Sequence, residues 1–159
     1  MSRFIPNERS KILVLIGHDD PNAVSVADLA TAVDITGQVM SLNASSQGNT
    51  VPTPSLDSLF ETSIPGTVQA SFSMDCYRDD EPTKDIAWTT LPRGTKAIVV
   101  ISRVGPATGT TLAANDKAEA WPIMVVSRTM SNMASNTPAS FTLNASVYEV
   151  PNENLTITA

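Results

Sequence analysis

The chain has very few of the residues that form disulfides, metal sites or reactive centres. Its 159 residues include a single cysteine, Cys76, and a single histidine, His18. One cysteine excludes an internal disulfide and a thiolate zinc site, and one histidine excludes any site that needs two imidazoles. Only 16% of the residues are charged, below the roughly 25% that is usual for soluble domains. We therefore expect a fold that is held together neither by disulfides nor by metal ions.

Basic residues and long apolar runs are also scarce. Ten basic against sixteen acidic residues give a formal net charge of −6, which argues against a protein that grips phosphate backbones. The longest apolar run covers residues 12–16, much shorter than a membrane span, so we expect no membrane partner. The N-terminal residues lack the apolar segment of a secretory signal, which predicts a protein made and kept in the cytosol.

Alternation of apolar and polar residues is the dominant pattern that is present. Residues 68–78 are apolar at every even position from Val68 to Cys76, and residues 141–147 are apolar at every odd position from Phe141 to Val147. A period of two predicts strands with one buried and one wet face. Weaker patterns predict further strands. These are residues 11–16 and 97–101, both covered on two faces; 123–128, starting after Pro122 or lying at an edge; 33–40, with a bulge at Gly37; and 155–158.

Two short helices are predicted between the strands. Thr53 and Pro54 resemble an N-cap and first helical position, and Leu56, Leu59 and Phe60 then form an apolar stripe that should lie on a sheet. A second helix is expected within residues 84–91, and loops over residues 43–52, 105–114 and 131–140. The predicted fold is a single all-β domain, residues 1–159, of sandwich or half-barrel type with a short flanking helix.

The search for reactive groups gives little. His18, Asp19 and Asp20 would suit a divalent metal ion, but their neighbours Gly17, Pro21 and Asn22 favour a simple turn. Cys76 lies on the apolar face of a strand, which is typical of a small core residue. The chain contains no nucleotide-binding loop and no serine-nucleophile elbow. We therefore predict no catalytic residue, no metal ligand and no cofactor.

Lightly charged strands favour self-assembly. Antiparallel sheets have exposed edges, and monomeric proteins protect these edges from pairing with other chains by charge, bulges or covering segments. Here lysines and arginines stand mostly at the ends of the predicted strands, for example Lys11, Arg78 and Arg128. Neighbouring copies could pair such edges and close a barrel. The alternative is that bulges and loops cover the edges in a monomer.

Several segments resemble the major tail tube proteins of long non-contractile-tailed bacteriophages. They are residues 34–42, 51–61, 64–67, 88–95 and 121–125, and the similarity of order and character spans about residues 10–150. The resemblance implies a β-sandwich subunit of stacked hexameric rings in the virion tail, built in the host cytoplasm. It also implies a channel that conducts genomic DNA without specific binding, a tape-measure protein inside it, and tail terminator or tip proteins at its ends. The family offers no catalytic motif.

The alternation then predicts which side chains would face the channel. These are the polar positions of the two clearest strands: Gln69, Ser71, Ser73, Asp75, Thr142, Asn144 and Ser146. Six copies at −6 each would give −36 per ring, and like charge would disfavour sticking of DNA.

The polar loop over residues 43–52 is expected to order on a neighbouring ring or to remain a mobile surface loop. Its candidate contact residues are Ser45, Ser46, Gln47, Gly48 and Asn49. Two other functions stay open: a phage-associated β-sandwich that serves as a binding or decoration module, and a hydrolase with a site around His18.

Overall fold

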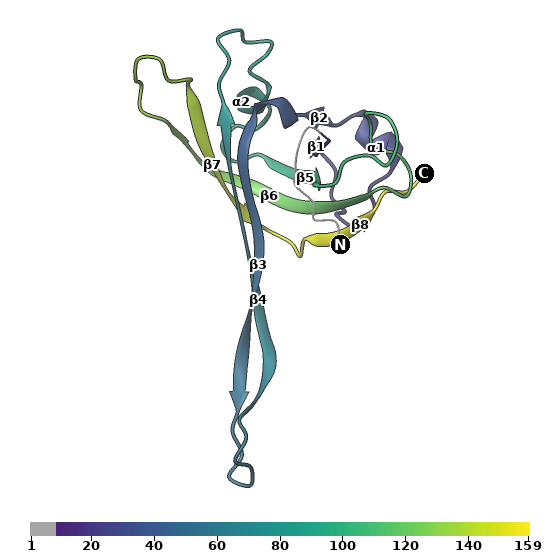
Figure 1. Ribbon diagram of the computed structural model, residues 1–159, viewed down its shortest axis with the longest axis vertical. Coiled ribbons are helices and arrows are strands. Elements are labelled where there is room, and N and C mark those ends of the chain that lie inside the picture. The colour runs from purple at the N-terminus through teal and green to yellow at the C-terminus, as the bar shows by residue number, and fades with distance from the viewer. Residues whose placement is uncertain (1–8) are drawn as a thin grey trace.

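The computed structural model describes residues 9–159 as one curled antiparallel sheet with two short flanking helices (Figure 1). The elements in chain order are β1 (Lys11–Ile16), α1 (Val26–Ala30), β2 (Val33–Asp34), a 3-10 turn (Thr36–Gln38), β3 (Val39–Thr53), β4 (Thr62–Tyr77), α2 (Ile86–Thr90), β5 (Lys96–Ser102), β6 (Lys117–Met130), β7 (Ser140–Val147) and β8 (Asn152–Thr156). The strand order is β2-β1-β5-β6-β7-β4-β3, and β8 pairs with β6. The all-β prediction is confirmed, in the form of one open sheet.

Apolar side chains fill both faces of the middle of this sheet. On β5, Val99 and Ile101 enter a larger core, while Ile98 and Val100 enter a smaller one on the opposite face. The larger core also contains Trp121, which is 1% exposed. A β-branched strand without alternation is typical of burial on two faces, so the prediction for residues 97–101 is confirmed.

The two strands with the clearest alternation behave as predicted near the core. Phe72, Met74, Phe141 and Leu143 are buried, and their polar neighbours face away. β4 is longer than predicted, however, and Val68 on its outer part is 68% exposed. The apolar–polar alternation of β4 therefore continues past the core, where its apolar side chains are no longer buried.

The helix expected after Thr53 does not form. Residues 54–61 make turns at the far end of the β3–β4 hairpin, and Leu56 and Leu59 are fully exposed there. A helix of about ten residues needs a surface to pack on. The hairpin carries this segment away from the body of the molecule (Figure 1), so that prediction was wrong. The second expected helix is confirmed as α2, inside residues 84–91.

Helix α1 has a local signal that the sequence reading missed. Ser25 is its N-cap, and the Ser25 side chain accepts a hydrogen bond from the backbone N–H of Asp28. The Asp28 carboxylate in turn accepts from the backbone N–H of Ser25 at 2.9 Å. This reciprocal capping box is written in the sequence as Ser-x-x-Asp.

Three other expectations need correction. Residues 33–40 are not one strand: β2 ends at Asp34, and the 3-10 turn separates it from β3. Residues 43–52 are not a loop but part of β3, because they pair along β4. β6 does not start at Pro122 but continues through it. Pro122 lies between the part of β6 that pairs with β8, up to Ala120, and the part that pairs with β7, from Ile123. At this junction the carbonyl of Pro122 accepts a hydrogen bond from the N–H of Tyr148. The missing N–H of Pro122 therefore interrupts no hydrogen-bonded strand pair.

Candidate functional site

A long hairpin extends from the body of the molecule. We call residues 48–68 the arm: it is the outer part of β3 and β4 together with the turns that join them (Figure 1). The two strands pair from Gly48↔Val68 to Thr53↔Thr62, with a bulge between Gly48 and Thr50. Every arm residue except Gly66 is exposed, including Phe60, which is 77% exposed near the tip. The arm thus makes no use of the protein's own core.

A continuous polar face covers four neighbouring strands at the base of the arm. Its β4 and β7 members are register partners: Ser71 pairs with Ser146, Ser73 with Asn144, and Asp75 with Thr142. We call this surface the polar face; it consists of Ser41, Asn43, Ser45 and Gln47 on β3, Gln69, Ser71, Ser73 and Asp75 on β4, Thr142, Asn144 and Ser146 on β7, and Met124, Ser127 and Thr129 on β6. The seven residues chosen from sequence therefore all lie together. Alternation alone missed the β3 and β6 members.

Hydroxyl and amide groups dominate this face, and Asp75 is its single charged residue. The Asp75 carboxylate accepts hydrogen bonds from Thr142 Oγ1 at 2.6 Å and from Ser41 Oγ at 2.8 Å. The hydrogen bond from Thr142, followed by the one from Ser41, lowers the pKa of Asp75 below its ordinary value. Asp75 is therefore ionised at neutral pH and held against the sheet.

The candidate contact loop has a different structure from the one expected. Ser45, Ser46, Gln47 and Gly48 are strand residues that pair with β4, and Asn49 sits at the bulge. Ser45 Oγ lies 3.1 Å from Ser71 Oγ on the polar face, whereas Ser46 Oγ donates to Glu153 Oε1. These five residues thus form the root of the arm, not a free loop.

Beyond the other end of β4, two arginines enclose an aromatic ring. The guanidinium carbons of Arg78 and Arg128 lie 3.9 Å and 3.7 Å from the ring centre of Trp88. Arg78 also pairs with Asp85 at 2.8 Å, and the Trp88 ring meets Phe141 edge-on at 5.0 Å. The stack fixes α2 over the larger core, so Trp88 is an anchor, as its residue type suggested.

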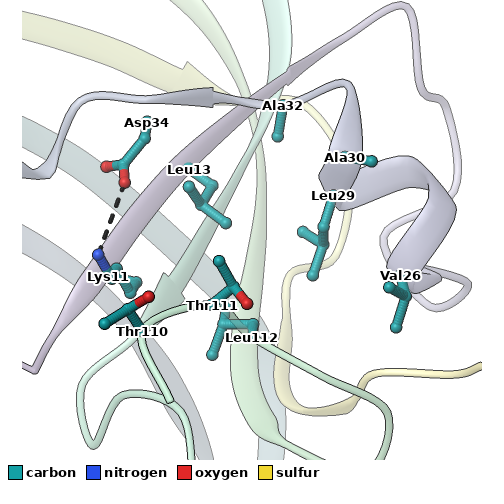
Figure 2. Close-up of a pocket in the computed structure, with 10 residues that line it drawn as sticks. All are labelled: Lys11, Leu13, Val26, Leu29, Ala30, Ala32, Asp34, Thr110, Thr111 and Leu112. Carbon is teal, nitrogen blue, oxygen red and sulfur yellow. Dashed lines mark ion pairs between the residues drawn. The ribbon is translucent and has the colours of Figure 1, made fainter.

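The pocket beside α1 carries little chemistry. It has a volume of about 420 Å³ and lies between α1, β1 and the loop that contains Leu112 (Figure 2). Leu13, Leu29 and Leu112 point into it, and its two charged residues, Lys11 and Asp34, pair with each other at 3.7 Å. The pocket therefore offers an apolar surface with no unpaired charge.

The other candidate reactive residues have structural roles. His18 Nε2 lies 2.8 Å from the carbonyl oxygen of Ala23, which closes the predicted turn. Burial raises the pKa of the Cys76 thiol to about 12, so the thiolate that would act as a nucleophile is scarcely populated. Over residues 9–159, no group of three or more His, Cys, Asp or Glu side chains could hold a metal ion. No helix in the described part of the chain has the length and apolar character to cross a bilayer.

Together, the uncharged β3 strand at the sheet edge, the polar face and the exposed arm define a structural protein that acts by assembly. The phage tail tube protein family matches the chain over residues 1–159, and the chain belongs to that family. It is therefore a structural subunit of a phage tail tube, which places it in the virion tail. No curated protein sequence matches it.

Solved structures of similar fold come from phage-like particles. A chain in the tail of an empty gene transfer agent particle, determined with C6 symmetry, is 18% identical over 96% of this chain and 97% of that one, with a TM-score of 0.54. A chain in the virion of a native gene transfer agent particle is 17% identical over 89% and 93%, with a TM-score of 0.51. A chain of the sixfold-symmetrised anti-feeding prophage baseplate is 13% identical over 100% of both chains, with a TM-score of 0.58.

Proposed function

We propose that six copies of this chain form a ring whose channel is lined by the polar face, and that stacked rings conduct genomic DNA during ejection. The observation that carries this proposal is the polar face itself. Four adjacent strands bring hydroxyl and amide groups to one surface while Phe72, Met74 and Leu143 bury the other. A sheet with one wet and one buried face suits the wall of a water-filled channel.

The number of strands fits a DNA conduit. Four strands from each of six copies give ~24 strands, and at ~4.8 Å spacing and ~40° tilt these enclose a barrel about 48 Å across at the backbone. Side chains leave a lumen that is wider than a DNA duplex. Sixfold symmetry is that of the similar tail and baseplate particles.

The charged residues are distributed unevenly over the chain. Over residues 9–159 the charged side chains lie mostly in loops and turns, and the polar face contributes only Asp75. A ring would thus present six carboxylates to the lumen among neutral hydroxyls and amides. Lys96 of β5 borders this surface, because it pairs in register with Met124. The four strands themselves bring no lysine or arginine to the polar face, so a phosphate backbone finds few cations to pair with and DNA slides without specific binding.

The arm supplies the contact between rings. It extends well past the body, carries Leu56, Leu59 and Phe60 unburied near its tip, and has its root at residues 45–49. Those side chains would be covered on a copy in the next ring. A contact of this head-to-tail kind does not close on itself, so it generates a tube.

The further partners follow from the role. A tape-measure protein would occupy the lumen before ejection, and terminator or tip proteins would cover the last exposed arms or arm-binding surfaces. Assembly would take place in the host cytoplasm before the tube joins the virion.

Cysteine labelling of assembled tubes tests the orientation of the polar face. Ser71→Cys and Asn144→Cys should react with a bulky thiol reagent in the monomer, where both residues are exposed, and be protected in intact tubes. Thr110→Cys, on an exposed loop outside the polar face, is the matched control and should react in both states. Labelling of Ser71→Cys on the outer surface of intact tubes would rule the orientation out.

A further inference from the structure

The body of the molecule ends at one register pair on the core side of the β3–β4 hairpin. Ser46 pairs with Ala70, and both side chains are half-buried. The next core-side pair inward contains Phe72, which lies in the larger core. The next pair outward contains Val68, which is 68% exposed. The arm therefore begins directly beyond Ser46 and Ala70.

Strand β7 does not support the arm. The pairing of β4 with β7 starts at Ser71↔Ser146, so in the described chain residues 62–70 of β4 pair with β3 alone. A bulge between Gly48 and Thr50 interrupts that remaining pairing. Bulges bend a strand locally and increase its twist. The direction of the arm is thus open to change at its root.

One side-chain contact links the root of the hairpin to another element. Ser46 Oγ donates a hydrogen bond to Glu153 Oε1 at 2.9 Å, although the two residues are 107 positions apart in the sequence. Glu153 lies on β8, which pairs with β6 and whose Leu155 is 1% exposed in the smaller core. Over residues 9–159 this is the one side-chain hydrogen bond from residues 46–70 to an element outside the hairpin. Glu153 therefore connects the root of the arm to a strand that is anchored in the body.

A small change of angle at this contact has a large effect at the arm tip. Thr53, the last paired residue of β3, is seven positions after Ser46, so at ~3.3 Å per residue it lies about 23 Å beyond the contact. A rotation of ~10° about the root would move Thr53 by about 4 Å, close to the spacing of neighbouring strands. The exposed Leu56, Leu59 and Phe60 follow Thr53 in the turns at the tip. Docking of these side chains on another copy therefore requires a fixed direction of the arm.

We propose that Glu153 is a positioning residue: by accepting the hydrogen bond from Ser46, it fixes the direction in which the arm leaves the body. The inference rests on the proposed stacking role of the arm, because a fixed direction places the apolar tip for its contact with the next ring. An arm that already points in its docking direction loses less freedom on association. Because Glu153 is itself exposed, this hydrogen bond competes with water and contributes little to the stability of the fold.

Distances between spin labels test the direction of the arm in unassembled subunits. Ser63→Cys in the arm and Thr110→Cys in the body carry the labels at exposed positions. Cys76 stays unlabelled because it is fully buried and the pKa of its thiol is raised to about 12. We expect Glu153→Ala to broaden the distance distribution by about 4 Å, the displacement that a ~10° swing of the arm produces. Ser46→Ala should have the same effect, and the double variant should add nothing further, because both changes remove one hydrogen bond.

Two other variants separate the hydrogen bond from the charge. Glu153→Gln keeps an oxygen that accepts from Ser46, so it should keep the narrow distribution. Glu149→Ala removes an exposed carboxylate that makes no hydrogen bond to the hairpin in the described structure, so it should leave the distribution unchanged. The proposal is wrong if Glu153→Ala leaves the distribution narrow, or if Glu153→Gln or Glu149→Ala broadens it as much as Glu153→Ala.

Tube growth, followed by negative-stain microscopy, separates this proposal from the proposed function. Glu153→Ala should keep the Tm and the rings of the unmodified chain but lengthen tubes about fivefold more slowly, the scale set by one hydrogen bond of modest net strength. Tubes that need the arm but grow at the unmodified rate in Glu153→Ala would overturn the positioning role alone. A variant that lacks residues 48–68 and still forms tubes would overturn the stacking role, and with it the need for a fixed arm, whatever the label distances show.

Discussion

Removal of the arm should separate folding from stacking. The variant replaces residues 48–68 by Asn-Gly, which joins Gln47 to Gln69. These two residues are register partners, and Asn-Gly favours the two-residue turn that links antiparallel strands. The shortened hairpin keeps the β3–β4 pairs from Val39↔Cys76 to Gln47↔Gln69 and every buried residue of both strands. We therefore expect a folded subunit that forms rings but no tubes.

The small expected effect on stability follows from the exposure of the arm. None of residues 48–68 is buried, and Val51 and Ile64 remain 49% and 54% exposed even though they are strand residues. A shorter connection also costs less closure entropy. We expect a change in the free energy of unfolding within about 1 kcal/mol, or a shift in Tm of no more than ~4 °C for a chain of this size.

A core variant provides the scale for that comparison. Leu143 is 0% exposed in the larger core, and Leu143→Ala should cost about 2–5 kcal/mol, or roughly 4–20 °C in Tm. Differential scanning calorimetry measures both variants, and negative-stain microscopy counts rings and tubes. Normal tubes from the armless variant would refute the stacking role. A loss of Tm like that of Leu143→Ala would show that the arm belongs to the fold.

Three further variants or measurements test local features. Cys76 is buried with a raised pKa, so at pH 8 a disulfide reagent should react with it at least a hundredfold faster in denaturant than in the native protein. Gly105 has φ +83° and a Cβ there would overlap the carbonyl oxygen of Arg9, so Gly105→Ala should lower Tm by several degrees more than Gly94→Ala, whose φ is +86° in open space. Hydrogen bonds lower the pKa of Asp75, so its contribution to stability is present above about pH 4 and is lost as the pH falls below that value; in urea titrations Asp75→Asn should flatten this acid limb.

The part of the site that could be predicted from sequence is the part that borders the core. Apolar and polar side chains alternate along residues 71–76 and 141–146, because one side of each strand packs on Trp121 and its neighbours. Burial of one side therefore gives the sequence its period of two. Their adjacency in the sheet then places the seven predicted polar residues on one surface. In contrast, the outer part of β3 is exposed on both sides, and nothing there selects apolar residues at alternate positions. Its strand character comes from pairing with β4, which a local pattern does not reveal.

The error at the arm tip has a related cause. Thr53, Pro54 and the Leu56, Leu59, Phe60 stripe are valid local helix signals, but a short helix forms in water only when its stripe is buried. The hairpin places that stripe far from the core of its own subunit, where all three side chains are exposed. In the proposed tube, another copy would bury them. From sequence alone, such an apolar stripe predicts a helix packed on its own subunit. When the subunit offers no surface to cover the stripe, the same pattern favours assembly.

If the polar face lines the channel as proposed, the position of Asp75 would limit both the sticking of DNA to the wall and the barriers to its passage. In the proposed ring the six Asp75 carboxylates lie at one level of a wall whose backbone is roughly 24 Å from the axis, and hydrogen bonds from Thr142 and Ser41 hold them against that wall. The Debye length at physiological ionic strength is about 8 Å, so their field is largely screened before it reaches DNA on the axis. DNA that drifts toward this wall would enter the unscreened region and be repelled. In the proposed ring, a sparse set of fixed carboxylates on a largely neutral surface would therefore centre the duplex without slowing its axial motion. Dense wall charge of either sign would do this less well, because it would condense counterions or bind phosphates.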